Sequence, residues 1–280
     1  MLKILLRIFA ALPLPMIHGL GVILGWIMYL SDKKFSRRTQ DNLLNAKITG
    51  DAKEHRRRVH KCIQETGKGL LESFAIWFKS PASVQKWVKA CHGWEHVDAA
   101  LAENHGVIIL TPHLGCFEIT AQYYAATKPV TVLFRPARQE WLAPLIEEGR
   151  SRGQVKLAPT NMRGVRNLLK ALRRGEAVGI LPDQVPELGE GVWATFFGKP
   201  AYTMTLVSKL AETTQAPVLL AFGERLPWGR GFVIHFEPLD AEPTPQNVND
   251  AIERLVRMRP EQYMWSYKRF KQPQKKSAED

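Results

Sequence analysis

His113 and Glu118 are the residues whose types and spacing best suit acid–base chemistry. They lie in the stretch VIILTPHLGCFE, residues 107 to 118, in which an apolar run ends at Thr111 and Pro112. Residues five apart in one ideal helix point about 140° apart, so the two can meet only if His113 precedes the helix. A carboxylate bonded to one imidazole nitrogen makes the other more basic, so that it can deprotonate a hydroxyl. We expect His113 as general base and Glu118 as its orienting carboxylate; the alternative is a helix-capping histidine beside an unrelated surface glutamate.

Cys116 lies inside the same stretch and offers a thiol nucleophile as a rival. Gly115 and Phe117 flank it where a helix should start facing a sheet, and a free cysteine there is usually a small buried hydrophobe. Together with Cys62 and Cys91 it makes an odd, widely spaced set, which predicts free thiols in a reducing compartment. No paired Cys-x-x-Cys spacing is present, and a zinc site is not expected.

Short apolar runs from residue 106 onward predict the elements that position this site. Most of them alternate with segments of helical periodicity, which favours an α/β fold whose mostly parallel central sheet is covered by helices. Open α/β sheets carry their chemistry at the carboxyl ends of strands, where His113 falls. The last two runs flank residues 227–231 and should form an antiparallel hairpin. The runs begin at Val107, Val130, Gln154, Ala177, Val218 and Phe232, and helices are expected after the first run and over 140–151, 162–174, 203–214 and 247–258.

Residues 12 to 30, LPLPMIHGLGVILGWIMYL, are free of charged side chains and predict an N-terminal membrane helix. A helix of roughly 20 residues spans about 30 Å, the thickness of a bilayer's hydrocarbon. The basic cluster at 33–38 is denser than Lys3 and Arg7, which places the rest of the chain on the cytoplasmic side. A cleaved signal peptide fits poorly for want of a small-residue cleavage site. The other alternative is an amphipathic helix over 2–12, broken by prolines, and then a shorter insertion.

The chain divides into four expected regions. They are a membrane anchor over 1–32, a helical region over 33–105, an α/β core over 106–272 and a disordered tail over 273–280.

A formal charge of +12, from 39 Lys plus Arg against 27 Asp plus Glu, indicates an anionic partner. Nucleic acid, an acidic membrane surface and an acidic carrier protein all fit charge alone, as does an ordinary basic surface. Because no basic motif is interleaved with aromatic residues, nucleic acid is not expected.

An ordered set of motifs resembles the bacterial lysophospholipid-acyltransferase-like group that includes the late acyltransferases of lipid A biosynthesis, the lauroyl and myristoyl transferases. The match runs nearly from end to end. The resemblance implies a catalytic pair at His113 and Glu118, and further functional positions at Arg150 and Asp183. It also implies acyl carrier protein as acyl donor, a phosphorylated glycolipid acceptor, the bacterial inner membrane and no metal or bound cofactor. The motifs are SRRTQDNL at 36–43, His-x-x-x-x-Glu at 113–118, FRP at 134–136, GRSR at 149–152, RRGEAVGILPDQ at 173–184, FFGKPA at 196–201 and PEQYMWSYKRFK at 260–271.

Arg135, Arg150 and Asp183 can also be weighed by their chemistry. A guanidinium at Arg135 or Arg150 could bind a phosphate of the substrate or the oxyanion that develops on a thioester carbonyl. Asp183 could hold one of these arginines in place. The alternatives are ordinary surface charge for the arginines and a turn-forming role for the aspartate.

With the donor and acceptor that the resemblance implies, we expect an acyltransferase that moves a fatty acyl chain from acyl carrier protein to a hydroxyl of a lipid A precursor, without a covalent enzyme intermediate. One alternative is the same chemistry on another lipid acceptor, such as a lysophospholipid, an acylated amino acid or a phosphatidylinositol mannoside. The other is a basic membrane-tethered binding protein without catalysis.

Overall fold

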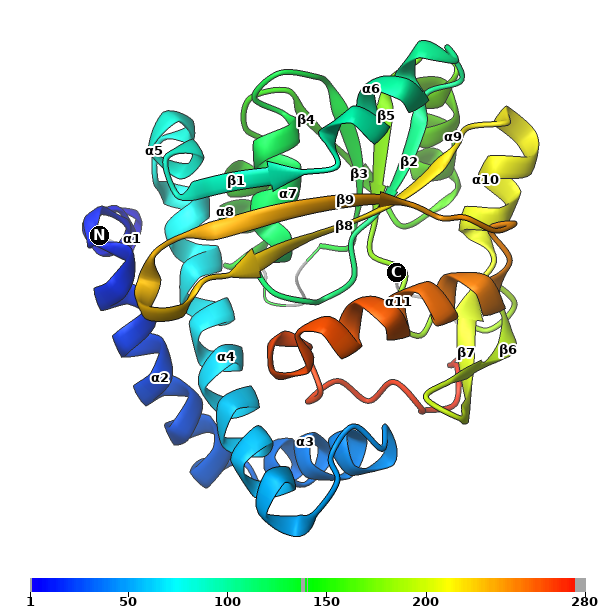
Figure 1. The fold of residues 1–280 in the computed structure, drawn as a ribbon. Coiled ribbons are helices and arrows are strands. Elements are labelled where there is room, and N and C mark those ends of the chain that lie inside the picture. The colour runs from blue at the N-terminus through cyan, green and yellow to red at the C-terminus, as the bar shows by residue number, and fades with distance from the viewer. Residues whose placement is uncertain (1, 137–138, 140, 275–280) are drawn as a thin grey trace.

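Seven strands form the central sheet within the part of the chain that this computed structural model describes, residues 2–136, 139 and 141–274. From edge to edge the order is β1, β9, β8, β2, β5, β3 and β4 (Figure 1). Neighbours are parallel except β8 and β9, which form the predicted antiparallel hairpin. The α/β fold and all six predicted strands are therefore confirmed. The strands are β1 (Val88–His92), β2 (Val107–Leu110), β3 (Val130–Phe134), β4 (Val155–Pro159), β5 (Ala177–Ile180), β8 (Val218–Arg225) and β9 (Phe232–Pro238).

Helices cover both faces of the sheet, because successive residues of a strand point to opposite faces. In β2, Ile108 and Leu110 belong to one apolar core and Val107 and Ile109 to the other. Side chains of α9, α10 and α11 fill the first core, and those of α6 and α7 the second. The predicted helices of this region are confirmed with shifted ends, residue 140 lying outside the described residues. They are α7 (Phe117–Tyr124), α8 (Ala143–Arg150), α9 (Met162–Leu172), α10 (Leu206–Thr214) and α11 (Pro245–Met258), whereas α6 (Trp94–Ala102) falls in the predicted helical region.

The apolar N-terminal segment is two helices, α1 (Leu2–Ala11) and α2 (Leu14–Ser31). Pro13 separates them in an extended conformation, with φ −60° and ψ 143°. Proline has no backbone N–H to donate, so it ends the first helix and is tolerated where the second begins. The single helix expected over 12–30 is thus replaced by the two-piece alternative. Among the described residues, α2 is the one helix long and apolar enough to cross a bilayer.

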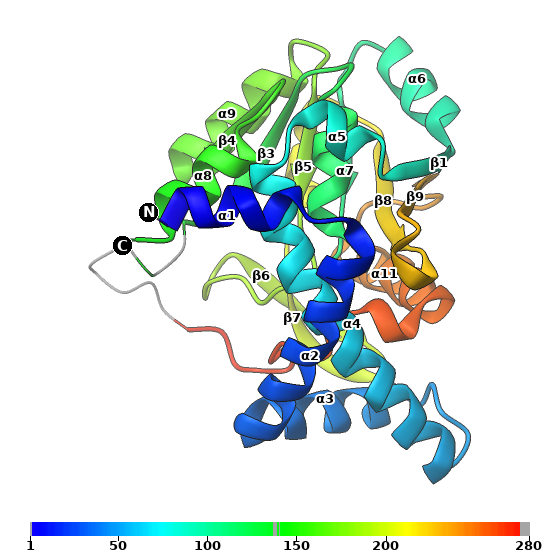
Figure 2. The ribbon, with the colours of Figure 1, turned by 90° about the vertical axis from the view of Figure 1, so that its left-hand side faces the viewer.

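Helix α4 (Ala52–Phe78) lies beside α2 in both ribbon views (Figures 1 and 2). The two backbones touch at facing glycines: a Cβ placed on Gly67 would collide with the carbonyl oxygen of Gly21 and lie 2.5 Å from the nitrogen of Gly25. The other helices of the predicted helical region are α3 (Lys33–Asn45) and α5 (Pro81–Gln85). The region is not wholly helical, because β1 interrupts it and joins the sheet.

A second small sheet and the C-terminal segment complete the core. Strands β6 (Gly191–Phe196) and β7 (Lys199–Met204) pair antiparallel across Phe197 and Gly198, both with positive φ, as a tight hairpin turn requires. A single helical turn, η1 (Pro227–Gly229), closes the β8–β9 hairpin, and another, η2 (Pro260–Gln262), follows α11. Most of the tail predicted over 273–280 lies outside the described residues.

The glycine contact between α2 and α4 predicts a strong effect of one methyl group. Gly67→Ala should lower the free energy of unfolding by about 1–3 kcal/mol, because the helices must separate to admit it. Gly19→Ala is the matched control: its Cβ would meet nothing within 4 Å. There alanine should be neutral or stabilise by up to about 1 kcal/mol through its helix propensity. Urea unfolding in a common detergent measures both, and equal stabilities would contradict the packing described.

Candidate active site

His113 lies in the loop that follows β2, at the carboxyl end of the sheet's middle strands. Its Nδ1 is 2.8 Å from Oδ1 of Asp183, and its backbone N–H donates to Oδ2 of the same carboxylate at 2.9 Å. The two residues meet because they follow β2 and β5, which are adjacent parallel strands. The carboxylate that orients His113 is therefore Asp183. The expectation that Asp183 holds an arginine is wrong.

The Asp183 carboxyl is buried, yet it remains ionised at neutral pH. Burial alone would raise its pKa, but the adjacent His113 ring and backbone N–H outweigh this and hold the pKa below its ordinary value of 3.8. An ionised Asp183 accepts the Nδ1–H of His113 and leaves Nε2 as the basic nitrogen. Nε2 of Gln184 lies 3.1 Å from that nitrogen, so its amide N–H donates to it.

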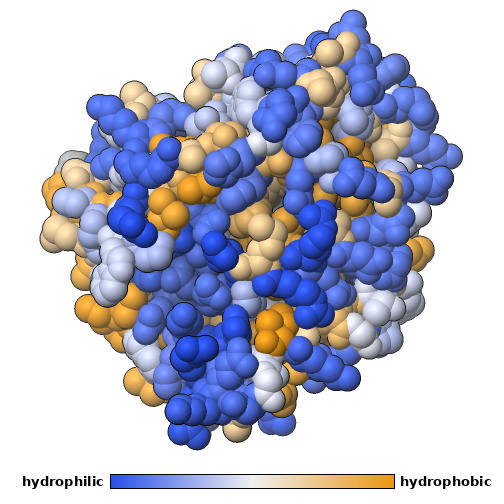
Figure 3. Space-filling view, in the orientation of Figure 1, coloured by the Kyte–Doolittle hydropathy of each residue, from blue (hydrophilic) through white to orange (hydrophobic). Residues whose placement is uncertain are grey.

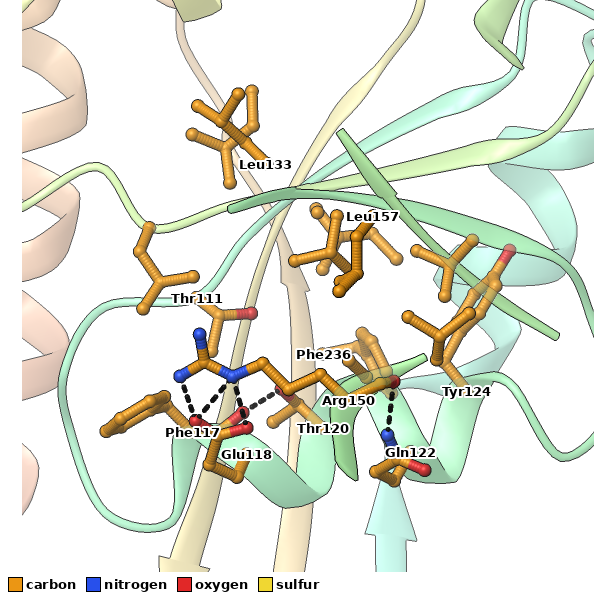
Figure 4. Close-up of a pocket in the computed structure, with 18 residues that line it drawn as sticks. Thr111, Phe117, Glu118, Thr120, Gln122, Tyr124, Leu133, Arg150, Leu157 and Phe236 are labelled. Atoms are coloured by element: carbon orange, nitrogen blue, oxygen red, sulfur yellow. Dashed lines mark hydrogen bonds and ion pairs between the residues drawn. The ribbon is translucent and has the colours of Figure 1, made fainter. Parts of the chain in front are cut away.

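The sequence had suggested that Glu118 orients His113. In the structure Glu118 instead binds Arg150 (Figure 4). Arg150 Nε donates to both carboxylate oxygens, at 3.0 and 3.1 Å, and its Nη2 forms a further bond to Oε1. Trp77 donates its indole N–H to Oε2 at 3.0 Å. Glu118 binds Arg150 because a buried carboxylate needs charged or hydrogen-bonding partners, and the Arg150 fork matches its two oxygens. Asp183 already occupies Nδ1 of His113.

Two cavities lie beside these pairs. The larger, about 320 Å³, has His113 in its wall and is lined by Met28 of α2, Arg38 of α3 and residues of α4 and of the C-terminal segment. The smaller, about 60 Å³, contains Glu118 and Arg150 and has apolar walls from the sheet. Phe117 lines both, with its ring centroid 4.8 Å from that of His113. Only the larger cavity reaches the lower end of the size range, about 300–1,000 Å³, that ligand pockets occupy.

The structure does not gather all the residues predicted for the site. Arg135 lines neither cavity: its side chain is 60% exposed and bonds Glu187 at 2.7 Å. Gln184 and Arg38 were missed as site residues. The signal for both was present, because Gln184 follows Asp183 directly and Arg38 falls in the motif at 36–43.

A buried ion network holds the loop between His113 and Glu118. Arg225 of β8 donates from Nη2 to the carbonyl oxygen of Gly115 at 3.2 Å and from Nε to Glu72 at 2.8 Å. Next to it, Cys116 donates its backbone N–H to Gly223 at 2.8 Å. Cys116 is buried, and burial raises the pKa of its thiol well above the ordinary value. A protonated thiol is a poor nucleophile, which favours the interpretation of Cys116 as a small buried hydrophobe.

Fold and site together define an α/β enzyme in which a histidine, paired with a buried carboxylate, faces a cavity beside an apolar N-terminal helix. Residues 1–272 match the family model described as bacterial lipid A biosynthesis acyltransferase, so the chain belongs to that family. The resemblance that the motifs indicated is thereby confirmed.

Curated relatives agree over nearly the whole chain. The chain is 28% identical over 268 residues to the lipid A biosynthesis lauroyltransferase of Escherichia coli (strain K12), covering 93% of this chain and 87% of the relative. It is 25% identical over 274 residues to the lipid A biosynthesis palmitoleoyltransferase of the same strain, covering 95% and 88%. A lipid A biosynthesis acyltransferase of Haemophilus influenzae is 25% identical over 279 residues, covering 95% and 87%.

The lowered pKa of Asp183 predicts how its contribution to stability depends on pH. A carboxyl whose pKa is lower in the folded than in the unfolded chain stabilises above its ordinary pKa and loses this effect as the pH falls through the folded value. Asp183→Asn should therefore cost about 3 kcal/mol near neutral pH, and less and less below the ordinary value of 3.8.

Urea unfolding of both proteins across this pH range measures the difference. Asp41→Asn is the matched control, because its carboxylate is 58% exposed and pairs only with exposed Arg37 among the described residues. That exposed pair should contribute at most about 1 kcal/mol. A cost for Asp183→Asn that stays constant with pH would contradict the assigned pair.

Proposed function

We propose that this protein transfers a fatty acyl chain from acyl carrier protein to a hydroxyl of a lipid A precursor. The family supports acyl transfer in lipid A biosynthesis. The observation that carries the mechanism is the His113–Asp183 pair, whose His113 lies in the wall of a cavity lined by residues of α2 and α3. A base held in one tautomer beside a partly apolar cavity suits the deprotonation of a lipid hydroxyl.

The proposed reaction proceeds in one enzyme-bound complex. The acceptor hydroxyl displaces the Gln184 amide from Nε2 of His113, gives its proton to that nitrogen and attacks the carbonyl carbon of the thioester. Asp183 stabilises the imidazolium that forms. The carbon–sulfur bond then breaks, and the sulfur leaves with the proton that the imidazolium returns. The products are an ester and the free thiol of the carrier, with no covalent bond to the enzyme.

The remaining charged residues receive roles in substrate binding. Glu118 acts as a positioning residue through Arg150, whose guanidinium takes the developing oxyanion. Arg38, in the wall of the His113 cavity, provides a cation for a phosphate of the acceptor. Exposed Arg135 contacts the same anionic substrate from outside the cavity.

The charge of +12 suits both proposed partners, because acyl carrier protein is acidic and the cytoplasmic face of a bacterial inner membrane is anionic. We therefore place the protein on that face. No metal or bound cofactor enters the proposed reaction.

Incubation of the purified protein with acyl carrier protein thioesters tests the function directly. A tetra-acylated lipid A precursor should gain the mass of one acyl chain, read by mass spectrometry. The parallel reaction with a lysophospholipid acceptor should give little product. Transfer to the lysophospholipid alone would overturn the proposed acceptor, and failure with every thioester would overturn the proposed donor.

Variants of the paired residues separate the two possible carboxylates. His113→Ala should lower kcat/KM by about 10²–10⁴, the usual worth of a general base. Asp183→Asn should cost nearly as much, and the double variant little more, because residues that act as a unit are not additive. Asp183→Glu should recover part of the rate. Glu118→Gln and Arg150→Gln should match each other instead, and their double variant should be no worse than either.

Thermal unfolding of each variant checks that it is folded. If Asp183→Asn kept full activity while Glu118→Gln and His113→Ala proved non-additive, the pair first suggested by the sequence would be the correct one.

A further inference from the structure

Helix α2 carries an exposed apolar row along one face. Its members are four, three, four and three positions apart, which places them on a single stripe of a helix. No charged residue lies between Leu14 and Ser31, and α1 adds two exposed apolar side chains. The row is Met16, Leu20, Ile23, Ile27 and Leu30, with Leu5 and Ile8 on α1.

The opposite face of α2 is fixed to the folded domain along its length. His18 is 3.0 Å from Oε2 of Glu72, and the backbones touch at Gly21, Gly25 and Gly67. Just before α2, Lys79, which follows α4, donates to the carbonyl oxygen of Ala10 in α1 at 2.8 Å. The helix therefore does not stand apart from the domain as a separate anchor.

A crossing of the bilayer by α2 would carry α4 into the hydrocarbon with it. Over the length that parallels α2, α4 holds two lysines and two glutamates: Lys61, Lys68, Glu65 and Glu72. A charged side chain at the centre of a membrane helix costs about 2.5–3.5 kcal/mol. The same exposed row can instead be buried without moving any charge if α2 lies flat on the membrane.

We propose that α1 and α2 lie in the plane of one leaflet of an anionic bilayer and that α2 does not cross it. This inference rests on the proposed membrane function. Both helices lie on the side of the molecule that faces the viewer in Figure 2, and apolar side chains gather along the same edge in Figure 3. In-plane helices of this kind bury one apolar face at the boundary between headgroups and acyl chains.

The surroundings of the row identify the occupant as a membrane. Trp228, 87% exposed, stands at the tip of the β8–β9 hairpin, whose Gly229 packs against Pro15 at the corner between α1 and α2. Tryptophan is typical of the membrane interface. Exposed basic residues flank the row and suit anionic headgroups. They are Arg7, Arg230, Lys33, Lys34 and Arg37.

The proposed orientation also explains how an acyl chain would reach His113. Met28 of α2 and Phe35 of α3 line the His113 cavity. With α2 flat in a leaflet, this cavity lies next to the acyl chains. A lipid can then enter without exposing its chains to water.

Protease access to an N-terminal extension tests the topology. The full chain is expressed with an epitope and a specific protease site before Met1. A flat α2 leaves this extension on the cytoplasmic side, so that the protease should cut it in inverted membrane vesicles and spare it in intact spheroplasts. Cutting in spheroplasts would show that α2 crosses the bilayer and would overturn the proposal.

Flotation with vesicles of phosphatidylethanolamine and phosphatidylglycerol tests the face itself. The triple variant Leu20→Ser, Ile23→Ser and Ile27→Ser should bind on the order of a hundredfold more weakly, because three exposed apolar side chains no longer enter the lipid. The control changes three exposed apolar residues elsewhere: Met162→Ser, Leu188→Ser and Met258→Ser. It should float like the unchanged protein. Equal flotation of both triple variants would contradict the assigned face.

Two further measurements distinguish a membrane-binding face from a dimer interface and test the face independently of the proposed acyl transfer. Light scattering in detergent-free buffer decides whether the row instead joins two copies: a dimer that only the α2 variant dissolves, without vesicle binding, would overturn the membrane assignment. Acyl transfer in mixed detergent micelles should persist in the α2 variant. A protein that floats as expected but transfers no acyl chain would contradict the proposed function and leave the membrane face intact.

Discussion

The buried guanidinium of Arg225 joins four parts of the chain on which the site depends. It contacts Glu72 and Glu65 of α4 and the Gly115 carbonyl, and Glu72 in turn contacts His18 of α2. Burial alone would raise the pKa of Glu72, but Arg225 outweighs it and lowers the pKa to about 2. The network therefore stays ionised at physiological pH, and loss of one member would leave an unpaired buried charge, which is strongly destabilising.

Both this network and the sheet hold the loop between His113 and Glu118 in place. Gly115, with φ +60°, approaches the Gly223 backbone so closely that no Cβ could fit between them. This close approach restricts the path of the loop from β2 to α7. His113 therefore lies at the end of β5, with its Nδ1 2.8 Å from Oδ1 of Asp183. The same Arg225 that orders the loop also orders α2 through Glu72. Packing of the N-terminal helices and geometry of the base are consequently linked through one ion cluster.

Local sequence patterns predicted most helices and strands, but they did not predict the contacts that depend on the order of strands in the sheet. Six apolar runs became strands, and Pro13 and Pro15 had already offered the two-helix alternative for the N-terminal segment. The predicted partner of His113 was wrong because Asp183 is 70 residues away in the sequence, and only the pairing of β2 with β5 brings the two together. Strand β1 was missed because VKACH is neither an apolar run nor a strict alternation. The cavity depends on packing between α2, α3, α4 and the C-terminal segment, which no local pattern contains.

The two carboxylates of the site have different partners, an imidazole ring for one and a guanidinium for the other. Asp183 faces His113, Glu118 faces Arg150, and the Phe117 ring lines the cavities of both. An exchange of partners would cost buried Asp183 both bonds from His113, the one to the imidazole and the one from the backbone N–H. In the proposed mechanism, proton transfer and anion binding therefore fall to different pairs. The His-x-x-x-x-Glu spacing sets the length of the loop that separates these two pairs.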